Sequence, residues 1–198
     1  MIGLTRPACP NPVALQTDYR HPDNKAALRT ASADKCMYCE SRVTQVYYGD
    51  VEHIKPKSKF PQLEFAWENL GYVCAICNGA KGNAWCDETP FINPYAEDPS
   101  DHLAAVGLMV FHRGGSERGE FTEMELELNR PALIERRGER LALLRYLHDK
   151  ATRTENAALR QRALAELDRQ LRDDCEYAMV CRAALERLVM CVGGASAD

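Results

Sequence analysis

The sequence predicts a small α+β fold in which short strands lie between paired cysteines and a helical extension follows. Three observations predict it. Two Cys-x2-Cys pairs are separated by 34 residues, which is room for strands and loops. A β-branched and aromatic run, Val43–Tyr48, lies between the pairs and is typical of a strand. After Arg130, leucines recur at helical spacing to near the end of the chain.

The elements before the second cysteine pair are short. Prolines interrupt residues 1–24, so we expect an irregular segment there. Asp23 is expected to cap a helix over Asn24–Ala33. The strand over Val43–Tyr48 is then followed by a second extended segment, Asp50–Ile54, which ends before a proline.

The middle of the chain alternates apolar segments with turns. Trp67–Val73 is a short apolar stretch that leads into the second cysteine pair, and Asn78–Lys81 opens a short helix. Residues 86–101 contain three prolines and predict a loop. Met109–His112 is expected to be a strand, with a Gly-Gly turn before the apolar segment Phe121–Leu126.

The helical extension begins at Pro131, a residue suited to the first turn of a helix. Thr154 is expected to cap a second helix, and Cys181–Val192 continues that apolar face or forms a third helix. We therefore expect an irregular segment with a short helix at 1–32, a core with its following loops at 33–125, and a helical extension at 126–198.

Composition excludes several classes of protein. The chain of 198 residues is 45% hydrophobic and carries a net charge of −4, so it is not a uniformly basic nucleic-acid coat. Residues 1–85 sum to +2 and residues 86–198 to −6. No apolar run reaches the roughly 18 residues of a membrane span, and the first ten residues do not resemble a signal peptide. We expect a cytoplasmic protein, in which nine cysteines indicate metal ligands and buried thiols.

The cysteine pairs are Cys36 with Cys39 and Cys74 with Cys77. Each pair can direct two thiolates from one tight turn at the same metal ion, and two such pairs complete a tetrahedral zinc site. The alternatives are four buried cysteines or a redox pair. The repeated spacing favours structural Zn²⁺.

The segment around the second pair carries side chains suited to phosphodiester cleavage. His53 can act as a general base near neutral pH. Glu52, on the opposite face of the strand, and Asn78 offer oxygen ligands suited to Mg²⁺ or Mn²⁺. Asn69 can hold the loop that positions the imidazole, and Asp50 is either a second-layer partner of the metal site or a surface charge.

Three stretches carry a family resemblance: Asp-Val-Glu-His-Ile-Lys-Pro-Lys-Ser from residue 50, Glu-Asn-Leu from 68, and Val-Cys-Ala-Ile-Cys-Asn-Gly-Ala-Lys-Gly from 73. In this order they resemble the ββα-metal core of HNH endonucleases of the four-cysteine type, over about residues 33–85. The resemblance implies that His53 is the general base, that Glu52 and Asn78 bind the catalytic ion, and that Asn69 orients the His53 loop. Glu replaces the commoner Asp at 52, and Asn replaces the His of many members at 78.

Weaker likenesses lie outside that core. The opening Arg-Pro-x-Cys-Pro, the loop Pro90–Tyr95 and the helical tail resemble the HNH proteins of bacterial antiphage defence, most closely the PtuB family of Septu systems, which is also found beside retrons. This resemblance implies an ABC/SMC-like ATPase of the PtuA type as partner and, beside retrons, a reverse transcriptase with its RNA. The helical extension is then either a bundle that covers the core or the surface that docks this partner.

Several alternatives stay open at this point. Lys55, Lys57, Lys59 and Lys81 flank the candidate site and are either phosphate contacts or solvated loop lysines. Asn78 could simply cap the following helix. The favoured function is a nuclease acting on DNA, with RNA as the second candidate. The main rival is a non-catalytic zinc module that binds nucleic acid or a protein partner.

Overall fold

The computed structural model describes residues 1–43 and 49–193 of the chain. Helices and short strands alternate irregularly along it. In chain order the elements are α1 (Pro12–Leu15), α2 (Pro22–Ala31), β1 (Asp50–His53), the 3-10 helices η1 (Pro61–Leu63) and η2 (Trp67–Asn69), β2 (Leu70–Val73), α3 (Ala75–Lys81), the 3-10 helix η3 (Pro99–Asp101), β3 (Leu103–Val106), β4 (Met109–His112), α4 (Glu117–Glu125), α5 (Pro131–Arg153), α6 (Ala157–Gln170) and α7 (Ala178–Gly193). The predicted α+β class is confirmed. Within the described ranges, no helix is long and apolar enough to cross a membrane.

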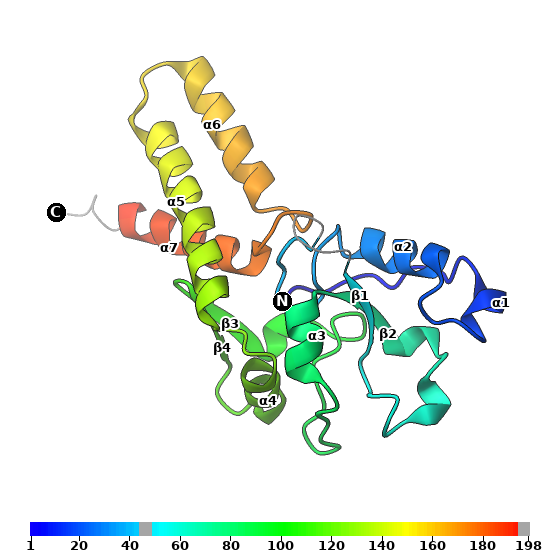
Figure 1. Cartoon of the computed structure of the whole chain (residues 1–198). Coiled ribbons are helices and arrows are strands. Elements are labelled where there is room, and N and C mark those ends of the chain that lie inside the picture. Colours follow the sequence, from blue (N-terminus) through cyan, green and yellow to red (C-terminus); the bar gives the residue numbers. More distant parts are fainter. Residues whose placement is uncertain (44–48, 194–198) are drawn as a thin grey trace.

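A β-hairpin followed by a helix forms the centre of the molecule (Figure 1). Strands β1 and β2 pair antiparallel, with Asp50 opposite Val73 and His53 opposite Leu70. All four residues of β2 are buried, and α3 starts directly after this strand and packs on β1. The strand predicted over Val43–Tyr48 falls on residues 44–48, which lie outside the described residues.

The first cysteine pair is attached to this hairpin through the backbone of Met37. The Met37 amide donates to the carbonyl of Tyr72 in β2 at 2.9 Å. Gly71 allows this close approach, because a Cβ at that position would lie 2.1 Å from Met37 Sδ. The two cysteine pairs are therefore brought together by strand β2, although they are far apart in sequence.

A second two-stranded sheet, β3 with β4, lies between the central hairpin and the C-terminal helices. The predicted strand Met109–His112 is confirmed as β4, whereas β3 was not predicted. The apolar segment Phe121–Leu126 belongs mostly to helix α4, which Ser116 caps by accepting a hydrogen bond from the Gly119 amide at 3.0 Å. Helix α4 packs on β4, and α7 packs on β3.

Two helix starts differ from the prediction. Helix α2 starts at Pro22, with His21 at the N-cap and no side-chain cap, so Asp23 lies inside the first turn. Proline has no N–H group that needs a capping partner, so it suits the first helical position. This explains why the helix begins at Pro22 and not after Asp23. Asn156, and not Thr154, caps α6: its Oδ1 accepts from the amides of Ala158 and Leu159 at 3.0 and 3.2 Å.

Helices α5 and α6 form an antiparallel hairpin that projects from the rest of the molecule, with α7 beside the base of α5 (Figure 1). We call α5, α6 and their connection, residues 131–170, the arm. Helix α5 has 23 residues and is therefore about 35 Å long at 1.5 Å per residue.

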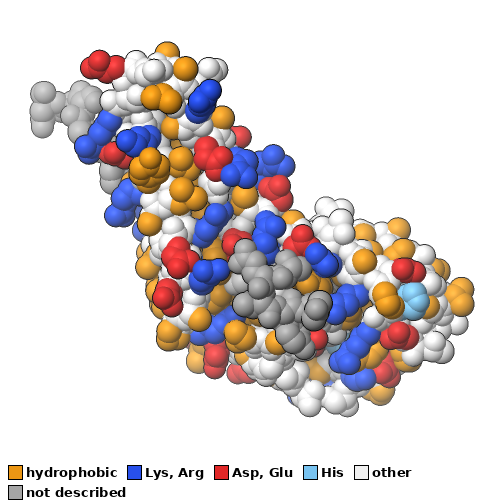
Figure 2. Space-filling view, turned by 45° about the horizontal axis from the view of Figure 1, so that its top comes forward, with side chains coloured by type: hydrophobic (Ala, Val, Ile, Leu, Met, Phe, Trp, Pro, Cys, Tyr) orange, Lys and Arg blue, Asp and Glu red, His pale blue; other side chains and the backbone are white. Residues whose placement is uncertain are grey.

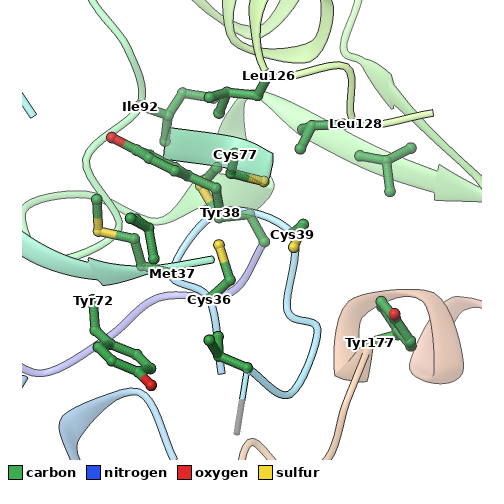
Figure 3. Packing of buried hydrophobic residues seen from close by; sticks show 14 of the residues in the cluster. Cys36, Met37, Tyr38, Cys39, Tyr72, Cys77, Ile92, Leu126, Leu128 and Tyr177 are labelled. Carbon is green, nitrogen blue, oxygen red and sulfur yellow. The ribbon is translucent and has the colours of Figure 1, made fainter. Parts of the chain in front are cut away.

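One hydrophobic core crosses the boundary that we expected between residues 125 and 126. It contains Tyr38 and Tyr72 from the central part together with Leu126, Leu133 and Tyr177 from the helical extension (Figure 3). Polar contacts reinforce the junction, since the buried Lys35 ammonium donates to the carbonyl of Cys175 at 2.9 Å. The helical extension is therefore anchored on the core, and the arm projects from this anchored base.

Candidate functional site

The four predicted cysteines converge on one point. Cys36, Cys39 and Cys77 are buried and Cys74 is half-buried, and their sulfur atoms all lie within 4.8 Å of one another. Figure 3 shows three of them, Cys36, Cys39 and Cys77, pointing toward a common space. Zinc–sulfur bonds of about 2.3 Å in a tetrahedron place the sulfurs about 3.8 Å apart, and the Cys39 and Cys74 sulfurs are 3.9 Å apart. The cluster therefore fits a structural Zn²⁺ ion.

The electrostatics around the four sulfurs favour a bound cation. Burial raises the pKa of Cys36 and hydrogen bonds with the neighbouring sulfurs raise the pKa of Cys77, whereas hydrogen bonds within the cluster lower the pKa of Cys39 and of Cys74. Four thiolates so close together need a cation to neutralise them. Arg130, at the start of α5, supplies further positive charge, with Nη2 3.5 Å from Cys77 Sγ.

His53 lies at the end of β1 in a defined orientation. Its Nε2 is 2.9 Å from the carbonyl oxygen of Glu64, and its ring packs edge-on against Tyr19 with centroids 4.5 Å apart. A carbonyl can only accept a hydrogen bond, so Nε2 carries the proton and Nδ1 of the neutral ring is the basic atom. Burial lowers the pKa of His53, and the nearby Lys57 and Lys81 charges lower it further against the raising effect of Glu64. The imidazole is thus neutral at pH 7 and able to accept a proton.

Asn69 fixes the loop that follows His53. Its Oδ1 accepts from the Lys55 amide at 2.8 Å, and its Nδ2 donates to the carbonyls of Lys55 and Leu63 at 3.0 and 3.3 Å. These three bonds tie both ends of the loop from residue 55 to 63 to the start of β2. The contacts agree with the expected orienting role, because Glu64, the partner of His53, follows this loop directly.

The face of β1 that is turned toward α3 carries the carboxylates. Asn78 Nδ2 donates to Asp50 Oδ2 at 3.1 Å, and Lys81 Nζ donates to Glu52 Oε1 at 2.7 Å and to the His53 carbonyl at 2.9 Å. Burial raises the pKa of Glu52 and lowers that of Lys81, while the attraction between the two charges opposes both shifts. Two carboxylates and an amide along this face are oxygen donors suited to Mg²⁺ or Mn²⁺.

Comparison with known families identifies this arrangement. Residues 36–84 match the model of the HNH endonuclease family. The chain contains an HNH endonuclease domain. The match begins at the first zinc cysteine and ends just after α3, so it covers both cysteine pairs, the β1–β2 hairpin and every candidate catalytic residue.

Two curated relatives extend the likeness beyond the HNH domain. The chain is 38% identical over 106 residues to the Septu protein PtuB of Bacillus thuringiensis, covering 53% of this chain and 40% of that protein. It is 28% identical over 153 residues to the Septu protein PtuB of Bacillus mycoides (strain KBAB4), covering 61% of this chain and 52% of that protein. The chain thus spans about half, or less, of the length of these relatives.

The expected phosphate contacts of the HNH domain divide into two groups. Lys55, Lys57 and Lys59 are exposed, and Lys57 pairs with Glu64 at 2.8 Å. Lys81, in contrast, has a fully buried side chain. Its ammonium is enclosed by Glu52 and the His53 carbonyl and is not exposed to a phosphate in this structure.

Two residues that contact the site were missed in the sequence. Tyr19 packs on His53 from an irregular segment 34 residues earlier, and Arg130 reaches Cys77 from a helix that starts 53 residues later. No local pattern marks either residue. Arg-Pro at 130–131 indicates only a helix start, and Tyr19 lies among residues without periodicity.

Proposed function

We propose that the chain is a metal-dependent endonuclease that hydrolyses phosphodiester bonds, with DNA as the favoured substrate and RNA as the second candidate. One observation carries the proposal. The hairpin that matches the HNH family also holds His53 with its Nε2 bonded to the Glu64 carbonyl and its Nδ1 able to accept a proton. A zinc module that only binds has no need of an imidazole with an oriented basic nitrogen. Plasmid DNA and total RNA, incubated with the purified chain and Mg²⁺ or Mn²⁺, test the activity and the substrate together.

In this proposal His53 accepts a proton from the attacking water at Nδ1. The hydrogen bond from Nε2 to the Glu64 carbonyl fixes the tautomer and the ring direction, and Tyr19 holds the ring from one side. Asn69 acts as a positioning residue, since it holds the loop that ends at Glu64. Neither Asn69 nor Tyr19 has to touch the reacting atoms.

Glu52 and Asn78 would hold the catalytic divalent ion, which when bound neutralises charge on the phosphate and the leaving oxygen. Asp50 contacts Asn78 and would orient its amide. Lys81 would keep the Glu52 carboxylate in place beside the backbone of His53. The buried ammonium is thus a positioning group in this proposal.

Variants of these oxygen donors should change the metal requirement differently. Glu52→Gln keeps an oxygen for Lys81 but removes the charge, and Asn78→Ala removes the amide, so both should lower cleavage at limiting Mg²⁺ and recover partly at excess Mg²⁺ or Mn²⁺. Asp50→Asn should cost about 10–100-fold in apparent metal affinity and leave the maximal rate intact, as for groups that orient a ligand. Cleavage rates over a Mg²⁺ titration measure both effects. A Glu52→Gln enzyme with the wild-type Mg²⁺ dependence would exclude Glu52 as a ligand.

We further propose that the nuclease is the effector of an ATPase-associated antiphage defence system. The support is the likeness to two Septu PtuB proteins. The proposed partner is an ABC/SMC-like ATPase of the PtuA type, joined beside retrons by a reverse transcriptase and its RNA, and the proposed docking part is the helical extension, residues 126–198.

Co-expression tests the partnership. We expect a tagged chain to retain the ATPase encoded beside it through affinity purification and size exclusion, and the nuclease to be weak without it. The control is the same tag without the chain, co-expressed with the same ATPase. Full nuclease activity in an isolated chain that captures no ATPase would contradict this part of the proposal and leave the nuclease assignment standing.

A further inference from the structure

The arm differs in charge from the rest of the chain. Residues 131–170 contain nine Lys and Arg against six Asp and Glu, a net charge of +3. Because the whole chain carries −4, the remainder sums to −7. The acidic balance that we assigned to residues 86–198 therefore does not extend to the α5–α6 hairpin, which is a basic projection on an acidic body (Figure 1).

Some cations of the arm are neutralised by carboxylates and others are not. Arg153, at the end of α5, pairs with Asp149. Closer to the base, Arg136 pairs with Glu139 at 2.9 Å and Arg169 with Glu166 at 2.6 Å. Four exposed cations at the distal end have no carboxylate oxygen within 4.0 Å among the described residues. They are Arg145, Lys150, Arg160 and Arg162.

These four cations surround the tip on both of its broad sides. On α6, Arg160 and Arg162 lie on either side of the buried Ala163, because a helix turns about 100° per residue. On α5, Arg145 and Lys150 lie on either side of the buried Leu144 and Leu147 in the same way. Figure 2 shows Lys and Arg side chains spread over the arm toward its tip.

One side of the tip is hollowed. A groove of about 620 Å³ runs between α5 and α6, and its lining includes Lys150, Arg162, Tyr146 and Leu159. The two carboxylates in the lining, Asp149 and Glu166, pair with Arg153 and Arg169. Tyr146 is 57% exposed, and the Lys150 ammonium lies 5.6 Å from the centre of its ring. An exposed aromatic ring between cations offers a stacking surface beside charges for phosphates.

We propose that the tip of the arm binds the phosphate backbone of nucleic acid without reading its sequence. The inference rests on the proposed function, because a nuclease with a net charge of −4 needs a local positive surface to hold a polyanion. Four exposed cations without carboxylate partners, beside an exposed aromatic ring, suit a chain of phosphates with unpaired bases. Arg145, Lys150, Arg160 and Arg162 contact phosphates, and Tyr146 supports an unpaired base.

The test uses the full chain in a His53→Ala background, without divalent ions, so that binding is measured apart from cleavage. The arm variant replaces the four distal cations by glutamine, a good helix former. A matched control variant changes the net charge by the same amount through four cations outside the arm. The control positions are Arg29, Arg42, Arg113 and Arg187.

Fluorescence anisotropy with a labelled 30-nucleotide DNA strand, its duplex and the matching RNA gives affinities between 50 and 200 mM KCl. We expect the arm variant to bind at least about tenfold more weakly. On the duplex, the slope of the logarithm of the binding constant against the logarithm of the salt concentration should become shallower by about 0.9 for each phosphate contact removed. The control should stay close to the parent chain. Zinc content and circular dichroism verify that each variant is folded.

Equal binding by the arm variant and the parent, equal losses in arm and control variants, or a parent that binds none of the three probes would each overturn the proposal. Loss of ATPase capture with unchanged nucleic-acid binding would make the tip a protein-docking surface instead. A chain that binds through the arm but never cleaves would contradict the proposed nuclease and leave this inference standing.

Discussion

Replacing Cys74 by serine should leave almost no folded chain. Structural zinc sites contribute about 10–16 kcal/mol of binding free energy in small peptides at pH 7, which matches or exceeds the 5–15 kcal/mol that stabilises a whole domain. Cys74 is also the N-cap of α3, where its sulfur accepts from the Cys77 amide at 3.4 Å. Serine is a good N-cap residue. The loss will therefore report on the metal and not on the helix start.

The damage should extend to the helical extension. Arg130 of α5 contacts Cys77, and Tyr177 before α7 bonds to Ser41, whose hydroxyl lies 3.3 Å from Cys39 Sγ. Loss of the cluster removes both anchors, so α5 and α7 should lose their packing together with the HNH domain.

Elemental analysis, circular dichroism and thermal unfolding measure this result. The wild type should hold about one zinc per chain, and Cys74→Ser should be insoluble or unfolded. Cys86→Ser is the matched control, because Cys86 lies outside the four-sulfur cluster. A Cys74→Ser chain that melts like the wild type, or a folded wild type without zinc, would show that the cluster is not a structural metal site.

The zinc cluster was predictable because the spacing of a Cys-x2-Cys turn encodes its own geometry. The positions of His53 and Asn69 beside it also follow from local order, since one ends β1 and the other precedes β2, and these two strands pair with His53 opposite Leu70. Short-range patterns therefore predicted the extended segment of β1 and the cysteine convergence, whereas the pairing of β1 with β2 was implied only by the resemblance to the ββα-metal core.

Features that depend on long-range packing were not predictable in the same way. Lys81 looked like an exposed phosphate contact, yet the antiparallel pairing places Glu52 within 2.7 Å of it in a buried position. The arm looked acidic when charge was summed over residues 86–198, because the sum includes acidic segments that fold elsewhere. Likewise Thr154 resembled a cap, but Asn156 two residues later makes the capping bonds. In each case the residue type indicated a plausible role, but the contacts that the residue makes depend on the fold and were not predicted.

His53→Ala should lower the rate of cleavage by about 10²–10⁴-fold, the usual cost of losing a general base. The substitution removes the proposed general base, whose basic nitrogen, Nδ1, is held in a fixed direction by the bond from Nε2 to the Glu64 carbonyl. The zinc cysteines lie outside this contact, so zinc content should be unchanged. The Glu64 carbonyl loses its partner, which costs about 1–3 kcal/mol at most and should appear as a modest drop in melting temperature.

Single-turnover cleavage of plasmid DNA at saturating Mg²⁺ separates this loss from weaker binding. His112→Ala is the matched control: His112 lies on β4, is exposed and pairs with Glu123 at 2.9 Å, so its removal should leave the rate within about twofold of the wild type on the scale of surface substitutions. A His53→Ala chain that cleaves as fast as the wild type would disprove His53 as the general base. A wild type that holds zinc and binds nucleic acid but never cleaves it would instead favour the non-catalytic zinc module, and the oriented imidazole would then serve binding alone.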